Sequence, residues 1–162
     1  MTRRIVLMGV AGCGKSSVGA ALGAALGLPY QDADDLHPPE NVAKMAAGIP
    51  LTDADRTPWL ADVGAALADD APLIIGCSAL KRRYRDQIRA AAGGAVTFVH
   101  LSGSRAVIEA RMAARANHFM PVSLLDSQFA ALEPPEPDET SLTVDIDQPL
   151  DRVVKDILAG LA

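Results

Sequence analysis

Short apolar runs along the chain alternate with longer segments in which apolar residues recur every three or four positions. Such runs are typical of strands in a parallel sheet whose two faces are both covered. Five strands are predicted, at Ile5–Met8, Leu28–Gln31, Pro72–Cys77, Val96–Leu101 and Leu142–Ile146. Because helical segments separate the strands, the connections are expected to be right-handed crossovers. The pattern therefore predicts an α/β protein with helices on both faces of a five-stranded parallel sheet.

The ends of several predicted helices carry clear signals. Residues 15–26 have apolar side chains at helical spacing and stop at Gly27, a typical C-cap. Thr52 and Asp55 resemble a capping box at the start of a later helix. All of 38–71 is expected to be helical, as an insert between the second and third strands. Further helices are predicted at about 79–91, 104–115, 123–132 and 150–161.

Composition places this pattern in one globular domain. A length of 162 residues fits a single domain, and 49% hydrophobic with 22% charged residues excludes a disordered chain. The net charge of −5 argues against a broad nucleic-acid-binding surface, and two cysteines, Cys13 and Cys77, suggest a reducing compartment. No apolar stretch reaches the roughly 18 residues of a membrane helix, and the run after Arg4 is too short for a secretory signal. A cytoplasmic protein with no membrane or nucleic-acid partner is expected.

The most specific motif lies between the first predicted strand and the first predicted helix. The run Gly9-Val10-Ala11-Gly12-Cys13-Gly14-Lys15-Ser16 matches the phosphate-binding pattern G-x-x-x-x-G-K-[ST] in the context that this pattern requires. Its backbone N–H groups and the helix dipole attract phosphate oxygens. Lys15 supplies a cation for the β- and γ-phosphates, and the Ser16 hydroxyl can ligate Mg²⁺. Ser17 extends the helix beside them, where an exposed hydroxyl is a simpler interpretation than a catalytic role.

Other sequence features indicate which class of nucleotide-binding protein this chain resembles. The chain lacks the N/T-K-x-D motif that reads guanine, and its third predicted strand ends at Gly76 without an acidic metal ligand. Asp32 and Asp34 follow the second strand, at the sheet edge where ligands of open α/β proteins bind. One can support the metal through water while the other accepts a hydrogen bond from a substrate hydroxyl. The alternative is a solvated acidic turn.

Basic residues gather in two places. The first group is Lys81, Arg82, Arg83, Arg85 and Arg89. Lys81, Arg85 and Arg89 repeat at helical spacing and suggest a positive face for an anionic substrate, although a solvated cationic face is the alternative. Arg111 and Arg115 form the second group, where they are placed to stack on adenine and to clamp the transferring phosphate.

Blocks spread over nearly the whole chain resemble the small P-loop gluconokinases, which are relatives of shikimate and adenylate kinases. The P-loop marks only the superfamily. The more specific blocks are Asp32–Pro38, Gly48–Leu60 and Cys77–Lys81, with further matches at Tyr84-Arg85, His118–Met120 and Val144–Pro149. Two departures are Cys13, where the family commonly has Ser, and Ala116-Asn117, where relatives often carry Lys-Gly.

The resemblance implies ATP-dependent phosphorylation of D-gluconate at its 6-hydroxyl, giving 6-phosphogluconate and ADP, with Mg²⁺. It implies a three-layer P-loop kinase fold with strand order 2-3-1-4-5, in a single domain over residues 1–162. It also implies a substrate-binding insert at about 38–71, a short lid at about 115–121 and a homodimer.

Roles for individual residues follow from the motifs and the resemblance together. Residues 9–17 are expected to bind the ATP phosphates, with Mg²⁺ on Ser16 and Asp32 in its outer shell. Asp34 is expected to orient the 6-hydroxyl and accept its proton. The substrate carboxylate and hydroxyls are assigned to Arg56, Lys81 and Arg85, with weaker roles for His37 and Lys44. The nucleotide is also expected to contact Arg111, Gln148 and Pro149 at its base and Arg115 at its γ-phosphate.

Two side chains and two other functions complete the expectations. Trp59 is interpreted as packing the insert, and Cys77 as a small buried hydrophobe. One alternative function is a small kinase acting on shikimate or a nucleoside monophosphate. The other is a nucleotide-binding module without turnover, against which the paired acids argue, because a sensor has no need to position an acceptor hydroxyl.

Overall fold

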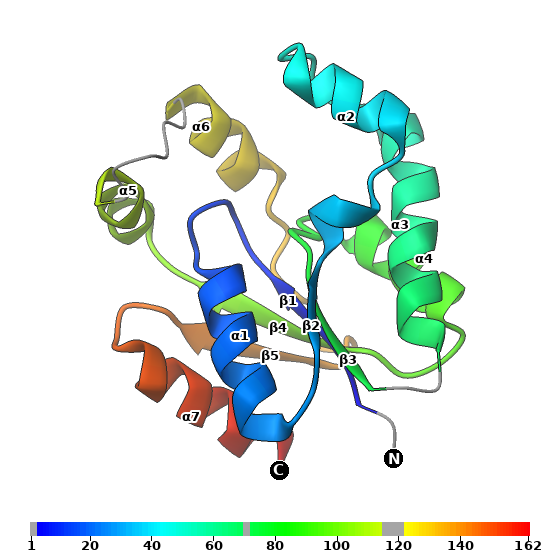
Figure 1. The fold of residues 1–162 in the computed structure, drawn as a ribbon. Helices are drawn as coiled ribbons and strands as arrows, with labels where there is room; N and C mark the ends of the chain where they lie inside the picture. Colours follow the sequence, from blue (N-terminus) through cyan, green and yellow to red (C-terminus); the bar gives the residue numbers. More distant parts are fainter. Residues whose placement is uncertain (1–2, 70–71, 115–121) are drawn as a thin grey trace.

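The computed structural model describes residues 3–69, 72–114 and 122–162. At its centre is a five-stranded sheet in which all paired strands are parallel, in the order β2-β3-β1-β4-β5 (Figure 1). The strands are β1 (Arg4–Met8), β2 (Tyr30–Asp32), β3 (Leu73–Gly76), β4 (Thr97–Ser102) and β5 (Ser141–Asp145). The expected strand number, direction and order are confirmed.

Helices cover both faces of this sheet, as the apolar runs predict. The central strand β1 is buried on both sides: Ile5 and Leu7 belong to one core cluster, and Val6 and Met8 to the other. The first cluster includes side chains of α1 (Lys15–Leu26), α5 (Arg105–Ala113), α6 (Val122–Ala131) and α7 (Leu150–Leu161). The second includes side chains of α3 (Asp53–Ala68) and α4 (Arg82–Ala92). Three layers result, with β1 in the middle.

The segment between β2 and β3 is helical, as expected. It contains the 3-10 helix η1 (Ala33–Leu36), α2 (Pro39–Ala46) and α3, and Figure 1 shows α2 standing above the rest of the fold. The predicted capping box is present, because the Thr52 hydroxyl accepts from the Asp55 N–H at 3.1 Å and the Asp55 carboxylate accepts from the Thr52 N–H at 2.9 Å. The capping box thus sets the residue at which α3 begins.

Two element boundaries differ from the predictions for local reasons. β2 begins two residues later than expected, because the Leu28 N–H donates to the Gly23 carbonyl at the end of α1. Helix α4 begins at Arg82 rather than near residue 79. Ala79 has a φ of 44°, outside the right-handed helical region, and its carbonyl accepts a hydrogen bond from the Arg85 guanidinium.

Among the described residues, no helix combines the length and the apolar character needed to cross a membrane. The expected lid, at about 115–121, lies outside the described residues.

Candidate active site

The loop between β1 and α1 has the backbone that its glycines predict. Gly12 has a φ of +82°, and a Cβ there would lie 2.7 Å from the Met112 side chain. Gly14 caps α1 in a left-handed conformation. The Cys13 side chain is fully buried beneath the loop, where a Cβ at Gly9 would meet its sulfur at 2.8 Å. Cys13 can therefore offer phosphate only its backbone, so that the departure from the usual Ser is tolerated.

Lys15 lies across this loop. Its Nζ donates to the carbonyls of Gly9 and Val10 at 3.0 and 3.2 Å and lies 3.7 Å from the Cys13 sulfur. The ammonium group is therefore held over the loop by weak acceptors, from which an anionic ligand can attract it.

A glutamine from a distant helix also reaches the loop. The side-chain oxygen of Gln128, in α6, accepts a hydrogen bond from the Ala11 N–H at 2.5 Å. Amides of this kind are the groups that bind phosphate in such loops. No local pattern in the sequence signals this contact, because the two residues are 117 positions apart.

The two predicted carboxylates lie together at the carboxyl end of β2. Asp32 caps η1, since its Oδ1 accepts from the Asp34 N–H at 2.9 Å. The Asp34 side chain is 79% exposed. Its pKa is nevertheless raised, first by partial loss of solvation and then by the charge of Asp32, while His37 and Lys15 oppose this rise. Asp34 thus follows the carboxyl end of β2, at the same edge of the parallel sheet as the P-loop that follows β1.

Tyr30, at the start of β2, is a site residue that sequence reasoning missed. Its ring packs against Gly19 of α1 and its phenol oxygen lies over Gly76 at the end of β3, and burial is the main cause of its raised pKa. Both contacts lie on other elements, so no local pattern in the sequence signals them.

His37, at the end of η1, and Trp59, in α3, pack against each other within the helical insert. Their rings stack with centroids 4.1 Å apart, and the Trp59 Nε1 donates to the Ala33 carbonyl at 2.7 Å. Trp59 therefore packs the insert, as expected. The His37 Nε2 lies 3.8 Å from the Asp34 carboxylate, and burial is the main cause of its lowered pKa. A neutral His37 beside Asp34 can hydrogen-bond but adds little charge.

Three basic side chains, two of them assigned to substrate, lie around one aromatic ring. Arg56 donates to the Tyr84 hydroxyl at 3.3 Å and to the Leu51 carbonyl at 2.9 Å. The Arg56, Lys81 and Arg83 cations lie 5.4, 5.9 and 5.6 Å from the centre of the Tyr84 ring. Tyr84 and Arg83 thus join the group that sequence reasoning assigned to substrate.

Acidic partners hold parts of this group in place. The Tyr84 hydroxyl donates to Asp53 at 2.6 Å, and Arg83 also pairs with Asp53. Lys44 donates to both carboxylate oxygens of Asp55 at 2.8 and 3.0 Å, which ties it to the start of α3.

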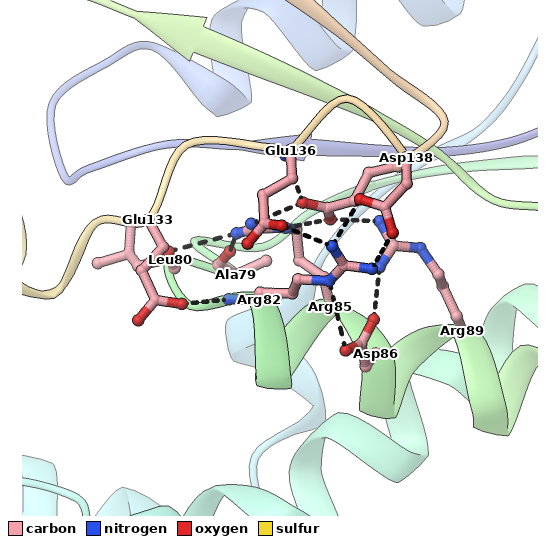
Figure 2. A network of polar contacts seen from close by, with 10 residues as sticks. Ala79, Leu80, Arg82, Arg85, Asp86, Arg89, Glu133, Glu136 and Asp138 are labelled. Atoms are coloured by element: carbon pink, nitrogen blue, oxygen red, sulfur yellow. Dashed lines mark hydrogen bonds and ion pairs between the residues drawn. The ribbon is translucent and has the colours of Figure 1, made fainter.

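The assignment of Arg85 to substrate is wrong. Its side chain is fully buried and paired with the equally buried Glu139 at 2.7 Å. Its NH1 also donates to the Ala79 and Leu80 carbonyls, as Figure 2 shows. Burial alone would raise the pKa of Glu139, but hydrogen bonds from Arg85, Arg89 and the Glu136 backbone lower it to about 2. Periodicity could not reveal this partner, which lies 54 residues away.

Two further arginines of the basic group in α4 are also paired with carboxylates. Arg82 donates to Glu136 and Asp138 at 3.0 and 2.6 Å (Figure 2). Arg89 donates to Glu139 at 2.5 Å. These pairs fasten the 133–139 loop to α4. Lys81 precedes the helix and takes no part in these pairs.

A cavity of about 330 Å³ adjoins the P-loop. Its lining includes five residues assigned to the nucleotide, which are Gly12 and Gly14 of the loop, Ser17, Arg111 and Gln148. The Arg111 guanidinium donates to the Ile146 carbonyl, and Gln148 donates to the Asp145 carbonyl at 2.8 Å. Pro149 caps α7 next to Gln148. Arg115 lies outside the described residues.

Comparison with known proteins identifies the family. No family model matches the chain. It is 40% identical to a probable gluconokinase of Mus musculus, over 97% of this chain and 96% of the mouse protein. It is 46% identical to the thermoresistant gluconokinase of Escherichia coli, over 92% of this chain and 87% of that protein. The crystal structure of a gluconokinase from Sinorhizobium meliloti has a TM-score of 0.91 and 52% identity, and covers 98% of this chain and 91% of its own.

The chain belongs to the gluconokinase family. It is therefore a P-loop kinase, which decides against a nucleotide-binding module without turnover. The three-layer fold expected for a small P-loop gluconokinase is also confirmed.

The donors in this gluconokinase-family site fit Mg²⁺ bound with a nucleotide. Ser16 is exposed in the first turn of α1, and Asp32 stands at the end of β2. Within residues 3–69, 72–114 and 122–162, no three acidic, histidine or cysteine side chains gather as a metal-binding group. Mg²⁺ keeps several waters and is usually held by one or two protein oxygens together with substrate phosphates, and the Ser16 hydroxyl and the Asp32 carboxylate are oxygens of this kind.

Proposed function

We propose that this chain transfers the γ-phosphoryl group of ATP to the 6-hydroxyl of D-gluconate, forming 6-phospho-D-gluconate and ADP. The observation that carries the proposal is a P-loop with Lys15 over its carbonyls and the carboxylates of Asp32 and Asp34 at the same edge of the sheet, in a gluconokinase-family chain. Phosphoryl transfer depends mainly on alignment and charge stabilisation, and this arrangement supplies both.

The nucleotide is assigned to the P-loop and the adjoining cavity. The amides of residues 9–17 bind its phosphates, and Lys15 leaves the Gly9 and Val10 carbonyls to pair with the β- and γ-phosphates. Arg111, Gln148 and Pro149 border the base, and Arg115 reaches the γ-phosphate. Ser16 and, through water, Asp32 hold Mg²⁺, which neutralises phosphate charge when bound.

Asp34 acts on the acceptor hydroxyl. Its carboxylate orients the 6-hydroxyl and takes its proton as the O6–P bond forms and the bond to the leaving ADP oxygen breaks. A raised pKa makes the Asp34 carboxylate a stronger proton acceptor. His37, close to Asp34 and uncharged, positions a neighbouring substrate hydroxyl.

The anionic end of gluconate is assigned to the cations around Tyr84. Arg56 and Lys81 are the principal ligands, because neither has a carboxylate partner as close as those of Arg82 and Arg85. Arg83 contributes charge from the same side, and Lys44 contributes weakly because Asp55 already pairs with it. A homodimer and a cytoplasmic location complete the proposal, and light scattering on the purified chain tests the dimer.

The deciding experiment compares acceptors in an assay coupled to ADP release. Gluconate, shikimate and AMP are supplied in turn with Mg–ATP, and ³¹P NMR identifies the phosphorylated position. We expect ADP release with gluconate and a phosphomonoester on carbon 6. Release with shikimate or AMP in place of gluconate, or no release with any acceptor, contradicts the proposal.

A further inference from the structure

Glu133, which follows α6, contacts the backbone on both sides of Lys81. Its own N–H donates to the Leu80 carbonyl at 2.7 Å, and its Oε1 accepts from the Arg82 N–H at 2.9 Å (Figure 2). These carbonyl and N–H groups belong to the two peptide units that flank Lys81. Both distances are those of well-formed hydrogen bonds, so one residue fixes the place of the Lys81 backbone.

Lys81 is an unusual residue for its position, which is the N-cap of α4. N-caps are usually Ser, Thr, Asp or Asn, whose oxygens accept from the first N–H groups of the helix, whereas a lysine ammonium can only donate. The helix also begins with Arg82 and Arg83, and positive charge is unfavourable at this end. Glu133 therefore supplies the acceptor and the negative charge that the start of α4 needs.

The chain on either side of Glu133 is itself constrained. Helix α6 ends just before it, and the Leu132 N–H donates to the Gln128 carbonyl at 3.0 Å, which continues the helical pattern. Pro134 and Pro135 follow directly, and a residue that precedes proline is restricted to extended conformations. Glu133 thus reaches α4 from a stiff support.

The side chain of Lys81 belongs to the group of cations around Tyr84. Its ammonium lies 5.9 Å from the centre of the Tyr84 ring, where the anionic end of gluconate is assigned. A lysine stem is flexible, so the position of its backbone decides which places the ammonium can reach. Glu133 is an anion and would repel a carboxylate, so it can assist gluconate binding only through Lys81.

We propose that Glu133 is a positioning residue for Lys81. It holds the backbone of Lys81 at the start of α4, so that the ammonium meets the gluconate carboxylate without first having to order this segment. The inference rests on the proposed function, because the assignment of Lys81 to gluconate is part of it. In this role Glu133 affects the binding of gluconate and leaves the phosphoryl-transfer step unchanged.

The test compares replacements of Glu133 in assays of ADP release at saturating Mg–ATP. Glu133→Ala loses one hydrogen bond, which predicts a KM for gluconate raised by roughly two- to tenfold, with kcat changed by less than about twofold. Glu133→Gln keeps an acceptor oxygen at the same reach, so its KM should stay within about twofold of the wild type. Thermal unfolding checks each variant, and the shorter Glu133→Asp replaces Glu133→Ala if the latter fails to fold.

Glu136→Ala is the matched control. It removes the same charge from the same loop, where the Glu136 carboxylate accepts from the Arg82 guanidinium at 3.0 Å. A general electrostatic effect would lower KM in Glu133→Ala, Glu133→Gln and Glu136→Ala alike, since each removes a negative charge that repels gluconate. Lys81→Ala should itself raise KM, and Glu133→Ala should have no further effect in that background.

The outcomes separate this inference from the proposed function. An unchanged or lowered KM in Glu133→Ala, an equal rise in Glu133→Gln or Glu136→Ala, or an effect additive with that of Lys81→Ala would each overturn the role of Glu133. If Lys81→Ala raises KM while one of these results is found, this inference alone fails. If Lys81→Ala leaves KM unchanged, or the wild type does not phosphorylate gluconate, that part of the proposed function fails and the role of Glu133 with it.

Discussion

The side-chain oxygen of Gln128 and the backbone N–H of Ala11 are joined by a hydrogen bond of 2.5 Å, which links α6 to the P-loop. An amide oxygen here takes an acceptor position that phosphate oxygens take in such loops. Nucleotide binding therefore has to displace this side chain. The cost is that of one neutral hydrogen bond, which is about 1 kcal/mol.

Replacing Gln128 by Ala should therefore tighten nucleotide binding by about fivefold, since 1.4 kcal/mol corresponds to a factor of ten. Calorimetry with ADP in the absence of gluconate measures this change. Gln128→Glu is the matched variant of opposite sign, because it places a negative charge beside the phosphates and should weaken binding. Weaker binding by Gln128→Ala would show instead that Gln128 is itself a nucleotide ligand.

Lys15→Ala should reduce kcat by roughly 10²- to 10³-fold, because it removes the charged donor that stabilises the transferring phosphate. The ammonium donates to the neutral carbonyls of Gly9 and Val10, so its removal leaves no oppositely charged group without a partner, and the variant should fold. Steady-state ADP release at saturating gluconate gives kcat, and circular dichroism checks folding. Normal turnover would exclude the assigned phosphate site.

Asp34→Asn should lower kcat by more than tenfold, since general-base assistance is typically worth 10²- to 10⁴-fold. The pH profile gives an independent readout. Because the pKa of Asp34 is raised, kcat/KM of the wild type should fall as the pH drops through a value above the ordinary 3.8 of aspartate. Asp34→Asn should lack this acidic limb. Retention of more than a tenth of kcat, or an unchanged limb, would remove Asp34 as the proton acceptor.

The fold and the core of the site follow from local patterns, whereas the missed contacts join distant residues. Buried runs such as Ile5–Met8 and the Thr52–Asp55 capping box act over a few positions, so they can be predicted from the sequence. Arg85 looked available for substrate because helical spacing says nothing of Glu139. Likewise, only the folded sheet brings Tyr30 over Gly76.

Arg56→Ala should raise KM for gluconate by roughly 10- to 100-fold with a smaller effect on kcat, because a hydrogen bond to a charged group contributes about 1.5–3 kcal/mol. Arg82→Ala is the matched control. It removes the same charge from a nearby helix, but Glu136 and Asp138 already hold that guanidinium. Initial rates over a range of gluconate concentrations distinguish the two. Equal increases in KM would point to a general electrostatic effect.

Arg85→Ala should destabilise the protein by about 3–5 kcal/mol, because it leaves the Glu139 carboxylate buried without its principal partner. Glu139→Gln tests the same pair where the first variant fails to fold. The pKa of Glu139 is lowered from 4.5 to about 2, so the stability that its ionisation provides is complete above 4.5 and is lost as the pH falls toward 2. Urea unfolding at steps of about one pH unit between roughly pH 3 and 7 gives the free energy of unfolding. It should fall with decreasing pH in the wild type and fall less in Glu139→Gln. Since Arg85 faces Glu139 rather than substrate, folded Glu139→Gln should keep its KM for gluconate. A large rise in KM without a change in stability would return Arg85 to the substrate site.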